Sequence, residues 1–272
     1  MRVLVLGGTC FLGRRVVERL HARGDSVLVA HRGRSEPAPW IPVRHLHTDR
    51  TDLAEHIGTI AEFAPDAVVD SCPLTAADVD AVPEDYDKLD VEQRWLRRDA
   101  TLLRLPLIYG PCDRQRREEV ILRRLRAHRQ HIPLGVGNLL WTRGYVDDLA
   151  TGVLAAVDNR TADGLAVNLG ETQTVTIRSW VSQVLQAAGG GAEMVTVPDA
   201  TLPPDLAITA APAQHLLVSV ARAQKLLGWS PGDPAPRVQE SVRWHLDHPP
   251  AGTTWTGADA AADDAALAAA ER

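Results

Sequence analysis

The chain has 272 residues, a formal net charge of -6 and 45% hydrophobic residues, the composition of an ordinary globular protein. The negative charge disfavours nucleic acid or an anionic membrane as its main partner, and no apolar stretch approaches the ~20 residues of a membrane-spanning helix. The 3 cysteines lie far apart and predict no metal site. Because the sequence begins directly with a strand-like segment and no targeting peptide, we expect a cytoplasmic protein.

The opening segment predicts a strand, a glycine turn, a helix and a second strand. Residues 2–6 predict a strand in which 3–6 form a continuous apolar run, as in a parallel strand that is covered on both faces. Gly7 and Gly8 end this run, and from Leu12 the apolar residues recur at helical spacing. Residues 26–30, which are apolar from Val27 onward, predict the second strand.

The alternation of strands and helices continues along the chain. Further strands are expected at 43–47, 67–69, 101–108 and 165–169, and helices at 52–60, 84–98, 118–128, 147–157, 177–188 and 220–227. Because parallel strands need crossover connections, this order predicts an α/β fold, a doubly wound parallel sheet of the Rossmann type with a smaller C-terminal α-rich substrate lobe. We assign 1–112, joined by 143–170, to the dinucleotide-binding domain, 113–142 and 171–250 to the substrate lobe, and the Ala- and Asp-rich 251–272 to a disordered tail.

The turn after the first strand has the spacing of a dinucleotide fingerprint. Gly7 permits a tight turn, and Gly13 lets the following helix pack closely against the strand. The backbone N–H groups and the positive helix end can then hold a pyrophosphate. Cys10 occupies the position of the usual middle glycine, and a turn without a ligand is the alternative interpretation. The predicted cofactor contacts are Gly7, Thr9, Cys10, Phe11, Leu12 and Gly13.

The end of the second strand predicts the choice of cofactor. An acidic residue there usually holds the ribose of NAD, but this chain has His31, Arg32 and Arg34. Since the planar guanidinium group matches a phosphate, we expect NADP(H) to be preferred, with NAD(H) as the alternative. The other interpretation is that the two arginines are solvated loop residues that bind no phosphate. Residues after the next two strands are expected beside the same cofactor, with Asp49 and Arg50 at the adenine, and Ser71, Cys72 and Pro73 at the nicotinamide.

Several short motifs in this order resemble the extended short-chain dehydrogenase/reductases, the group of NAD-dependent epimerases and dehydratases. Each motif is weak alone, and the resemblance covers the chain to about residue 249. The motifs are the glycine turn, Arg104-Leu105-Pro106-Leu107-Ile108-Tyr109-Gly110-Pro111, Arg143-Gly144-Tyr145-Val146-Asp147-Asp148-Leu149-Ala150, Asn168-Leu169-Gly170 and Lys225-Leu226-Leu227-Gly228-Trp229-Ser230-Pro231.

The usual catalytic pair of that family is altered in this chain. The resemblance implies a Tyr-x-x-x-Lys pair on one helix face, yet the position four before Lys88 is Glu84. Tyr86 lies two residues before Lys88 and points roughly 200° away from it on a regular helix. The segment between Ser71 and Lys88 is also too short for the strand that normally brings the catalytic Ser or Thr. Lys88 and Tyr86 remain the candidate catalytic residues, and Lys88 a candidate cofactor contact.

The resemblance implies an enzyme, an NAD(P)H-dependent oxidoreductase, and the altered pair implies an unusual proton source. The shortened core is similar to the ketoreductases of angucyclinone (simocyclinone-type) antibiotic biosynthesis. We therefore expect an NADPH-dependent ketoreductase that acts on a bulky polycyclic aromatic polyketide, with water, a protein side chain or a hydroxyl of the substrate itself supplying the proton. The expected substrate contacts are Tyr109, Trp141 and Arg143, and for Trp141 a packing role is an equally weighted alternative.

Two other functions remain open. The altered catalytic pair would also suit a catalytically silent NADP-binding sensor or regulator. RNA binding has one supporting feature, an arginine-rich segment, although Glu118, Glu119 and the net negative charge favour a solvated helix face as the interpretation of that segment. The sequence leaves the oligomeric state open. The arginines are Arg114, Arg116, Arg117, Arg123, Arg124, Arg126 and Arg129.

Overall fold

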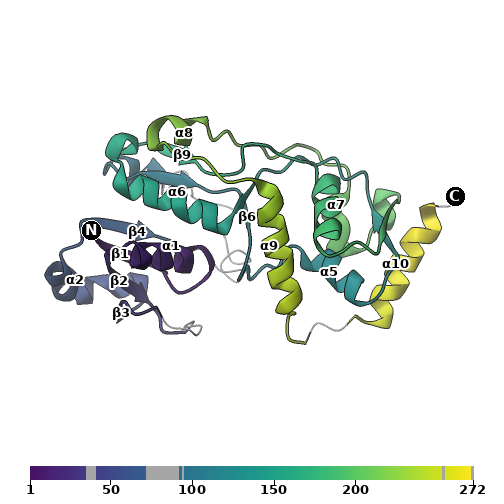
Figure 1. Ribbon diagram of the computed structural model, residues 1–272, viewed down its shortest axis with the longest axis horizontal. Coiled ribbons are helices and arrows are strands. Elements are labelled where there is room, and N and C mark those ends of the chain that lie inside the picture. The colour runs from purple at the N-terminus through teal and green to yellow at the C-terminus, as the bar shows by residue number, and fades with distance from the viewer. Residues whose placement is uncertain (35–40, 72–91, 94, 253–254, 271–272) are drawn as a thin grey trace. The chain divides into compact units, whose positions relative to one another are not determined.

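The computed structural model describes residues 1–34, 41–71, 92–93, 95–252 and 255–270 (Figure 1). The chain forms two compact units, each built from segments that are remote in sequence. Unit 1 contains 1–105, 146–169 and 220–231, and unit 2 contains 106–145, 170–219 and 232–272. Residues 220–231, which the sequence placed in the substrate lobe, are therefore part of unit 1, whereas 106–112 and 143–145, which it placed in the dinucleotide-binding domain, are part of unit 2. No helix within the described ranges is long and apolar enough to cross a membrane.

A parallel sheet organises unit 1. Its strands are β1 (Arg2–Leu6), β2 (Ser26–His31), β3 (Arg44–His47) and β4 (Ala67–Asp70), in the order β3-β2-β1-β4. All three neighbouring pairs are parallel. The central β1 is buried from Val3 to Leu6, which explains why the sequence shows an uninterrupted apolar run. The predicted α/β fold is confirmed.

Helices cover both faces of this sheet. On one face, the valines of β1 and β2 pack in one core cluster with Val16, Val17 and Leu20 of α1 (Phe11–Ala22) and with α6 (Val146–Asp158). The two helices are joined by Arg19, whose guanidinium group donates to both carboxylate oxygens of Asp147 at 2.9 and 2.6 Å. On the other face, the leucines pack against Phe63. This side is formed by the 3-10 helix η1 (Arg50–His56) and by α2 (Ile57–Phe63), so the predicted 52–60 helix begins as a tighter turn.

The rest of unit 1 corrects one predicted strand. The expected strand at 101–108 is wrong in length, because β5 (Leu102–Arg104) pairs with β9 (Ala166–Asn168) while β6 (Leu107–Tyr109) pairs elsewhere. Pro106 lies between β5 and β6 and has no N–H to donate to a sheet. The unit is completed by η2 (Arg160–Ala162) and α8 (Ala221–Leu227). Of the helix predicted over 84–98, only 92–93 and 95–98 lie within the described residues.

Among its described residues, unit 2 has two small parallel sheets and several helices. One sheet pairs β6 with β8 (Arg143–Tyr145), and the other pairs β7 (His131–Leu134) with β10 (Glu193–Thr196). A core cluster contains residues of α5, α7 and α9, with Ile121, Trp180 and Val242 among its buried members. The helices are α5 (Glu119–Arg126), η3 (Asp199–Thr201), η4 (Pro204–Thr209), α7 (Ile177–Ala187), α9 (Pro234–Asp247) and α10 (Gly257–Ala270).

The predicted disordered tail is wrong for residues 257–270, which form α10. The helix begins with a reciprocal cap, because the Asp259 N–H donates to Thr256 Oγ1 while the Thr256 N–H donates to Asp259 Oδ2. Asp263 and Ala266 are fully buried. The Ala- and Asp-rich composition suggested disorder, but buried Asp263 has a cationic partner, Arg124, more than a hundred residues earlier in the chain.

Candidate functional site

The glycine turn after β1 is fixed by its neighbours in the sheet. Gly7 has a φ of 83°, a backbone conformation that favours glycine. Its N–H donates to the Ala30 carbonyl oxygen at 3.0 Å, and the Ser71 N–H donates to the Leu6 carbonyl oxygen at 3.0 Å. The Ser71 hydroxyl also donates to that Leu6 oxygen at 3.0 Å. The ends of β2 and β4 therefore hold the turn from both sides.

Gly13 and Gly8 are required by close packing. A Cβ atom on Gly13 would lie 2.3 Å from the Gly7 carbonyl oxygen and 2.5 Å from Ser71 Oγ. A Cβ atom on Gly8 would lie 2.6 Å from a methyl group of Val17 and 2.8 Å from one of Val29. From the sequence, we predicted the close approach of helix and strand at Gly13 alone. The Gly7-Gly8 doublet also indicates close packing, so the role of Gly8 could have been predicted as well. Together these glycines bring the start of α1 against the end of β1.

The start of α1 has the features of an anion-binding helix terminus. Cys10 is the N-cap residue, and its side chain makes no capping hydrogen bond. The first turn of α1 contains no acidic residue. Phe11 adopts a φ of 41°, so the backbone bends sharply as it enters the helix. Helix N–H groups without a side-chain cap suit a pyrophosphate, and the residues present therefore fit a dinucleotide.

The residues predicted to recognise the adenosine end lie in one part of unit 1. Arg32 and Arg34 are exposed and follow β2, and Asp49 is half-buried just after β3. His31 differs from them, because it is only 6% exposed and hydrogen-bonds His45 of β3. The Arg50 backbone begins η1, and its side chain lies outside the described part. The sequence did not single out His45 or His47, since their relation to His31 depends on strand pairing.

Four other predicted site residues lie outside the described ranges. They are Cys72, Pro73, Tyr86 and Lys88. Their roles at the nicotinamide and in proton transfer stay predictions. Thr9 and Leu12, by contrast, are half-buried in the glycine turn region beside Cys10.

Tyr109 and Arg143, expected to touch substrate, lie in a buried network of unit 2. The Tyr109 hydroxyl donates to Glu171 Oε1 at 2.8 Å, and the Arg143 guanidinium lies 3.4 Å from Glu171 Oε2 and over the Tyr109 ring. Tyr109 and Arg143 are 1% and 3% exposed, and burial raises the pKa of the Tyr109 phenol. Sequence reasoning missed Glu171, which completes this network. Trp141 is half-buried beside the core of unit 2, and contact of these residues with substrate stays a prediction.

A second buried polar cluster in unit 2 links α9 to the residue before α5. Ser241 donates to Glu118 Oε1 at 2.6 Å, and His245 Nε2 lies 3.4 Å from Glu118 Oε2. Burial raises the pKa of Glu118, whereas burial and the nearby Arg116 lower the pKa of His245 to about 4. Because Glu118, Ser241 and His245 are at most 1% exposed, this cluster is a packing feature rather than a substrate site.

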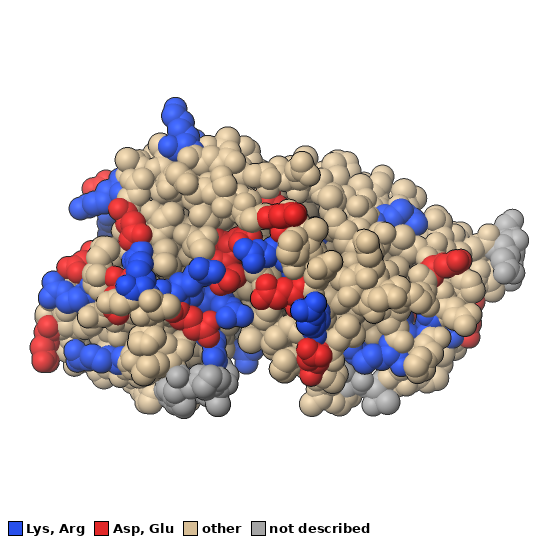
Figure 2. All heavy atoms as spheres, in the orientation of Figure 1, with Lys and Arg blue, Asp and Glu red and all other residues tan. Residues whose placement is uncertain are grey.

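The arginine-rich segment is largely paired with carboxylates inside unit 2. Arg124 is 2% exposed and donates to Asp205 and Asp263, and Arg123 forms ion pairs with Asp205 and Asp259. Arg126 and Arg129 pair with Glu119 and Asp264. Figure 2 shows basic and acidic side chains interspersed over the face it draws. Fewer guanidinium groups are therefore available to bind a polyanion such as RNA than the sequence suggests.

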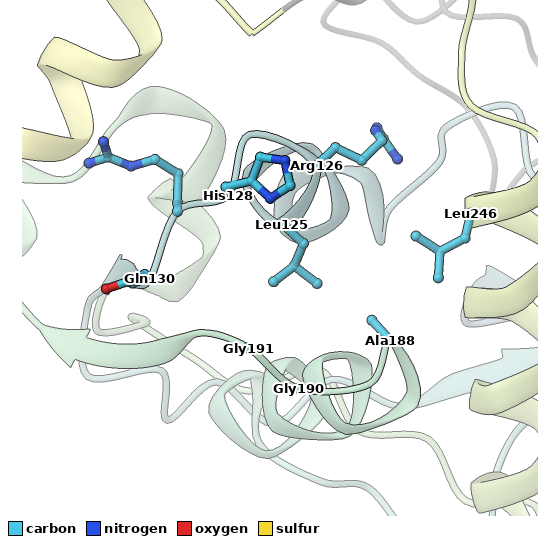
Figure 3. A pocket seen from close by; sticks show the side chains of 9 residues that line it. Leu125, Arg126, His128, Gln130, Ala188, Gly190, Gly191 and Leu246 are labelled. Carbon is cyan, nitrogen blue, oxygen red and sulfur yellow. The ribbon is translucent and has the colours of Figure 1, made fainter.

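A hollow of about 440 Å³ lies in unit 2 beside the end of α5. In Figure 3, Leu125, Ala188 and Leu246 point toward one another, while the Arg126 side chain extends away from Gly190 and Gly191. Arg126 and Arg129 at its rim are the arginines already paired with carboxylates. The hollow therefore gathers little uncompensated charge.

Comparison with known proteins gives the same fold. Residues 3–88 match the NAD dependent epimerase/dehydratase family. UDP-glucose 4-epimerase from Thermotoga maritima superposes with a TM-score of 0.68 at 17% identity, covering 91% of this chain and 99% of that one. The dTDP-glucose 4,6-dehydratase of Bacillus anthracis, determined in complex with NAD, gives 0.69 at 13% identity, covering 92% of this chain and 97% of that one.

A relative is also found by sequence. The chloroplast stem-loop binding protein of 41 kDa b from Arabidopsis thaliana is 26% identical over 284 aligned residues, which cover 85% of this chain and 75% of the relative. The structural neighbours, at these low identities, establish the fold of unit 1 and unit 2 but not a substrate.

Proposed function

We propose that this chain, whose residues 3–88 match the NAD dependent epimerase/dehydratase family, is an NADPH-dependent oxidoreductase that reduces a ketone. One observation carries the proposal. The start of α1 is uncapped and lies against a glycine turn whose Gly13 leaves no room for a Cβ atom. A helix terminus in this setting is suited to a pyrophosphate.

The residues of unit 1 divide the cofactor between them. The backbone from Gly7 to Gly13 would hold the pyrophosphate, and the exposed Arg32 and Arg34 would hold the 2′-phosphate of NADP(H). Asp49 would contact the adenine, and Ser71, which donates to the Leu6 carbonyl oxygen, would fix the turn on the nicotinamide side. Their common task is to bind and orient the dinucleotide.

When bound, NADPH would supply a hydride to the carbonyl carbon of the substrate, and water or a hydroxyl group of the substrate would give the carbonyl oxygen its proton. Tyr109 is unsuited as the proton donor, because its buried phenol already donates to Glu171 and its pKa is raised. The offset between Tyr86 and Lys88 also argues against the usual pair. The proposed substrate, by the family resemblance, is a bulky polycyclic aromatic polyketide whose own hydroxyl polarises the ketone. Most of the rate acceleration would then come from the orientation of the nicotinamide relative to the carbonyl group.

Turnover tests the proposal directly. Purified protein is mixed with NADPH and a panel of polycyclic hydroxyquinone ketones, and the loss of absorbance of the reduced nicotinamide is followed. We expect oxidation of NADPH with at least one ketone, and Tyr86→Phe to keep the rate within a few-fold. A loss of several orders of magnitude in Tyr86→Phe would identify this tyrosine as the acid.

The alternative is a catalytically silent NADP-binding regulator, which the altered Tyr86 and Lys88 spacing favours. Tight NADPH binding without turnover across the panel would support this alternative over the reductase. RNA binding, the activity in the name of the chloroplast relative, is not our proposal because Arg123, Arg124 and Arg129 already have carboxylate partners. Steep salt-dependent affinity for RNA would overturn that conclusion.

A further inference from the structure

His31 is a buried polar residue at the point where β2 leaves the sheet. It is 6% exposed, and both of its ring nitrogens take part in hydrogen bonds. The Gly33 N–H donates to His31 Nδ1 at 3.2 Å, so this nitrogen accepts and carries no hydrogen. The hydrogen of the neutral ring is therefore on Nε2, which lies 2.8 Å from His45 Nδ1. The direction of donation is from Gly33 to His31, and from His31 to His45.

Strand pairing fixes the ring of His31. β2 and β3 are parallel, with Val29 opposite His45 and His31 opposite His47. The His31 ring makes edge-to-face contacts with both histidines of β3, with centroid distances of 5.0 Å to His45 and 4.8 Å to His47. A ring held by two neighbours and two hydrogen bonds has little rotational freedom. The acceptor for Gly33 is consequently held in one place.

The anchored backbone lies between the two arginines proposed to hold the 2′-phosphate. Gly33 has a φ of 72°, a conformation that favours glycine, and Arg32 and Arg34 flank it as exposed residues. The Thr48 N–H adds a second anchor by donating to the His31 carbonyl oxygen at 3.0 Å. An arginine on a fixed backbone loses less conformational freedom on binding phosphate than one on a mobile loop.

We propose that His45 is a positioning residue for cofactor choice. Through His31 it holds the Gly33 backbone, and with it Arg32 and Arg34, in the arrangement that binds a 2′-phosphate. The inference rests on the proposed NADPH function. A metal ion is a poorer explanation of the three histidines, because the His45 Nδ1 lone pair already accepts from His31. Within the described ranges, no group of three or more His, Cys, Asp or Glu side chains is arranged to hold a metal.

The test compares dissociation constants of the full-length chain for NADPH and NADH by calorimetry. His45→Phe keeps a ring but removes the acceptor, and we expect NADPH binding to weaken by about three- to tenfold, the value of one hydrogen bond. NADH binding should stay within about twofold, because NADH lacks the 2′-phosphate. His45→Asn, whose Oδ1 accepts near the place of Nδ1, should restore most of the NADPH affinity. His47→Phe, which keeps the ring contact, is the matched control and should bind both cofactors as the wild type does.

Arg32→Ser separates this inference from the proposed function. If the wild type prefers NADPH and Arg32→Ser loses that preference, while His45→Phe keeps it, the role of His45 is overturned alone. If the wild type shows no preference for NADPH, the proposed cofactor fails and the inference fails with it. NADH binding reports whether the glycine turn is folded in every variant. Should His45→Phe fail to bind NADH, the comparison of His45→Asn with His45→Ala decides, and equal NADPH affinities would overturn the inference.

Discussion

The polar groups at the glycine turn of unit 1 and the buried charged groups of unit 2 differ in whether a side chain pairs with them. At the start of α1, the N-cap side chain makes no capping hydrogen bond and the first turn has no acidic residue. In unit 2, Arg143 and Arg124 are buried and face Glu171, Asp205 and Asp263. A helix N-terminus without a side-chain cap can bind a ligand through its backbone N–H groups. A buried charge that is already paired instead contributes to the stability of the fold.

This contrast explains why residue type alone was a partial guide to function. The same sequence pattern, an arginine near a family motif, describes exposed Arg32 and buried Arg143. Only the partner distinguishes them, since Arg143 has Glu171 within 3.4 Å. We therefore expect changes in the glycine turn to act on cofactor binding, and changes in the buried pairs to act on stability.

The largest effect on cofactor binding is expected for Gly13→Ala. The new methyl group would overlap the Gly7 carbonyl oxygen, 2.3 Å away, and push the start of α1 from the turn. NADPH affinity should fall by at least roughly 100-fold, about 2.7 kcal/mol, as measured by calorimetry. Gly58→Ala is the matched control, because a Cβ atom there meets nothing within 4 Å. Equal NADPH affinity in Gly13→Ala and the wild type would contradict the assignment of the glycine turn of unit 1 as the dinucleotide site.

Glu171→Gln tests whether the buried ion pair between Arg143 and Glu171 in unit 2 stabilises the fold. Arg143 would keep its buried position without a charged partner, and the free energy of unfolding should fall by about 3 kcal/mol in urea titrations. NADPH affinity should stay within about threefold. The double variant Arg143→Met/Glu171→Gln should recover at least half of the loss, since it removes the buried cation as well. A variant that keeps full stability would show that this pair is not structural.

The prediction of the fold from sequence succeeded where the signal was local. The apolar run of β1 and the helical spacing of Val16, Val17 and Leu20 depend on neighbouring residues, and the structure has both elements where expected. It failed where the cause was a distant partner. Helix α10 was expected to be disordered because nothing near Asp263 in sequence reveals Arg124, and Pro106 was not expected to separate two sheets.

The candidate site was predictable to the same extent. Gly7 and Gly13 follow from spacing, and the structure explains both by φ or by close packing. Gly8, His45 and Glu171 were missed, because their contacts arise from packing and from strand pairing. Such contacts have no fixed sequence separation, so no motif reports them.

His245 gives a pH-dependent test of the buried polar cluster in unit 2. Its pKa falls from 6.5 to about 4 in the folded chain, mainly through burial. As the pH falls from 6.5 to 4, the unfolded chain takes up a proton that the folded chain does not, so the free energy of unfolding decreases. Relative to His245→Gln, the wild type should lose about 2 to 3 kcal/mol over this interval in urea titrations. Glu118 is present in both proteins, and parallel pH profiles would contradict the assigned burial.

The smallest effects are expected on α10, where two neighbouring aspartates differ in exposure. Asp263 is fully buried against Arg124, whereas the Asp264 side chain is 63% exposed and pairs with Arg129. Asp263→Asn should cost about 2 kcal/mol of unfolding free energy, because Arg124 keeps Asp205, and Asp264→Asn less than about 0.5 kcal/mol. Thermal unfolding of the two variants side by side measures the difference, and equal costs would contradict the account of α10.

Amide hydrogen exchange with and without NADPH tests the central contrast most directly. NADPH should slow exchange at the amides of residues 7–14 and 31–34 of unit 1. The amides of α5 and those around Glu171 and His245 in unit 2 should change little. Protection confined to unit 2, or no protection anywhere at a saturating NADPH concentration, would contradict the assignment of the glycine turn as the dinucleotide site.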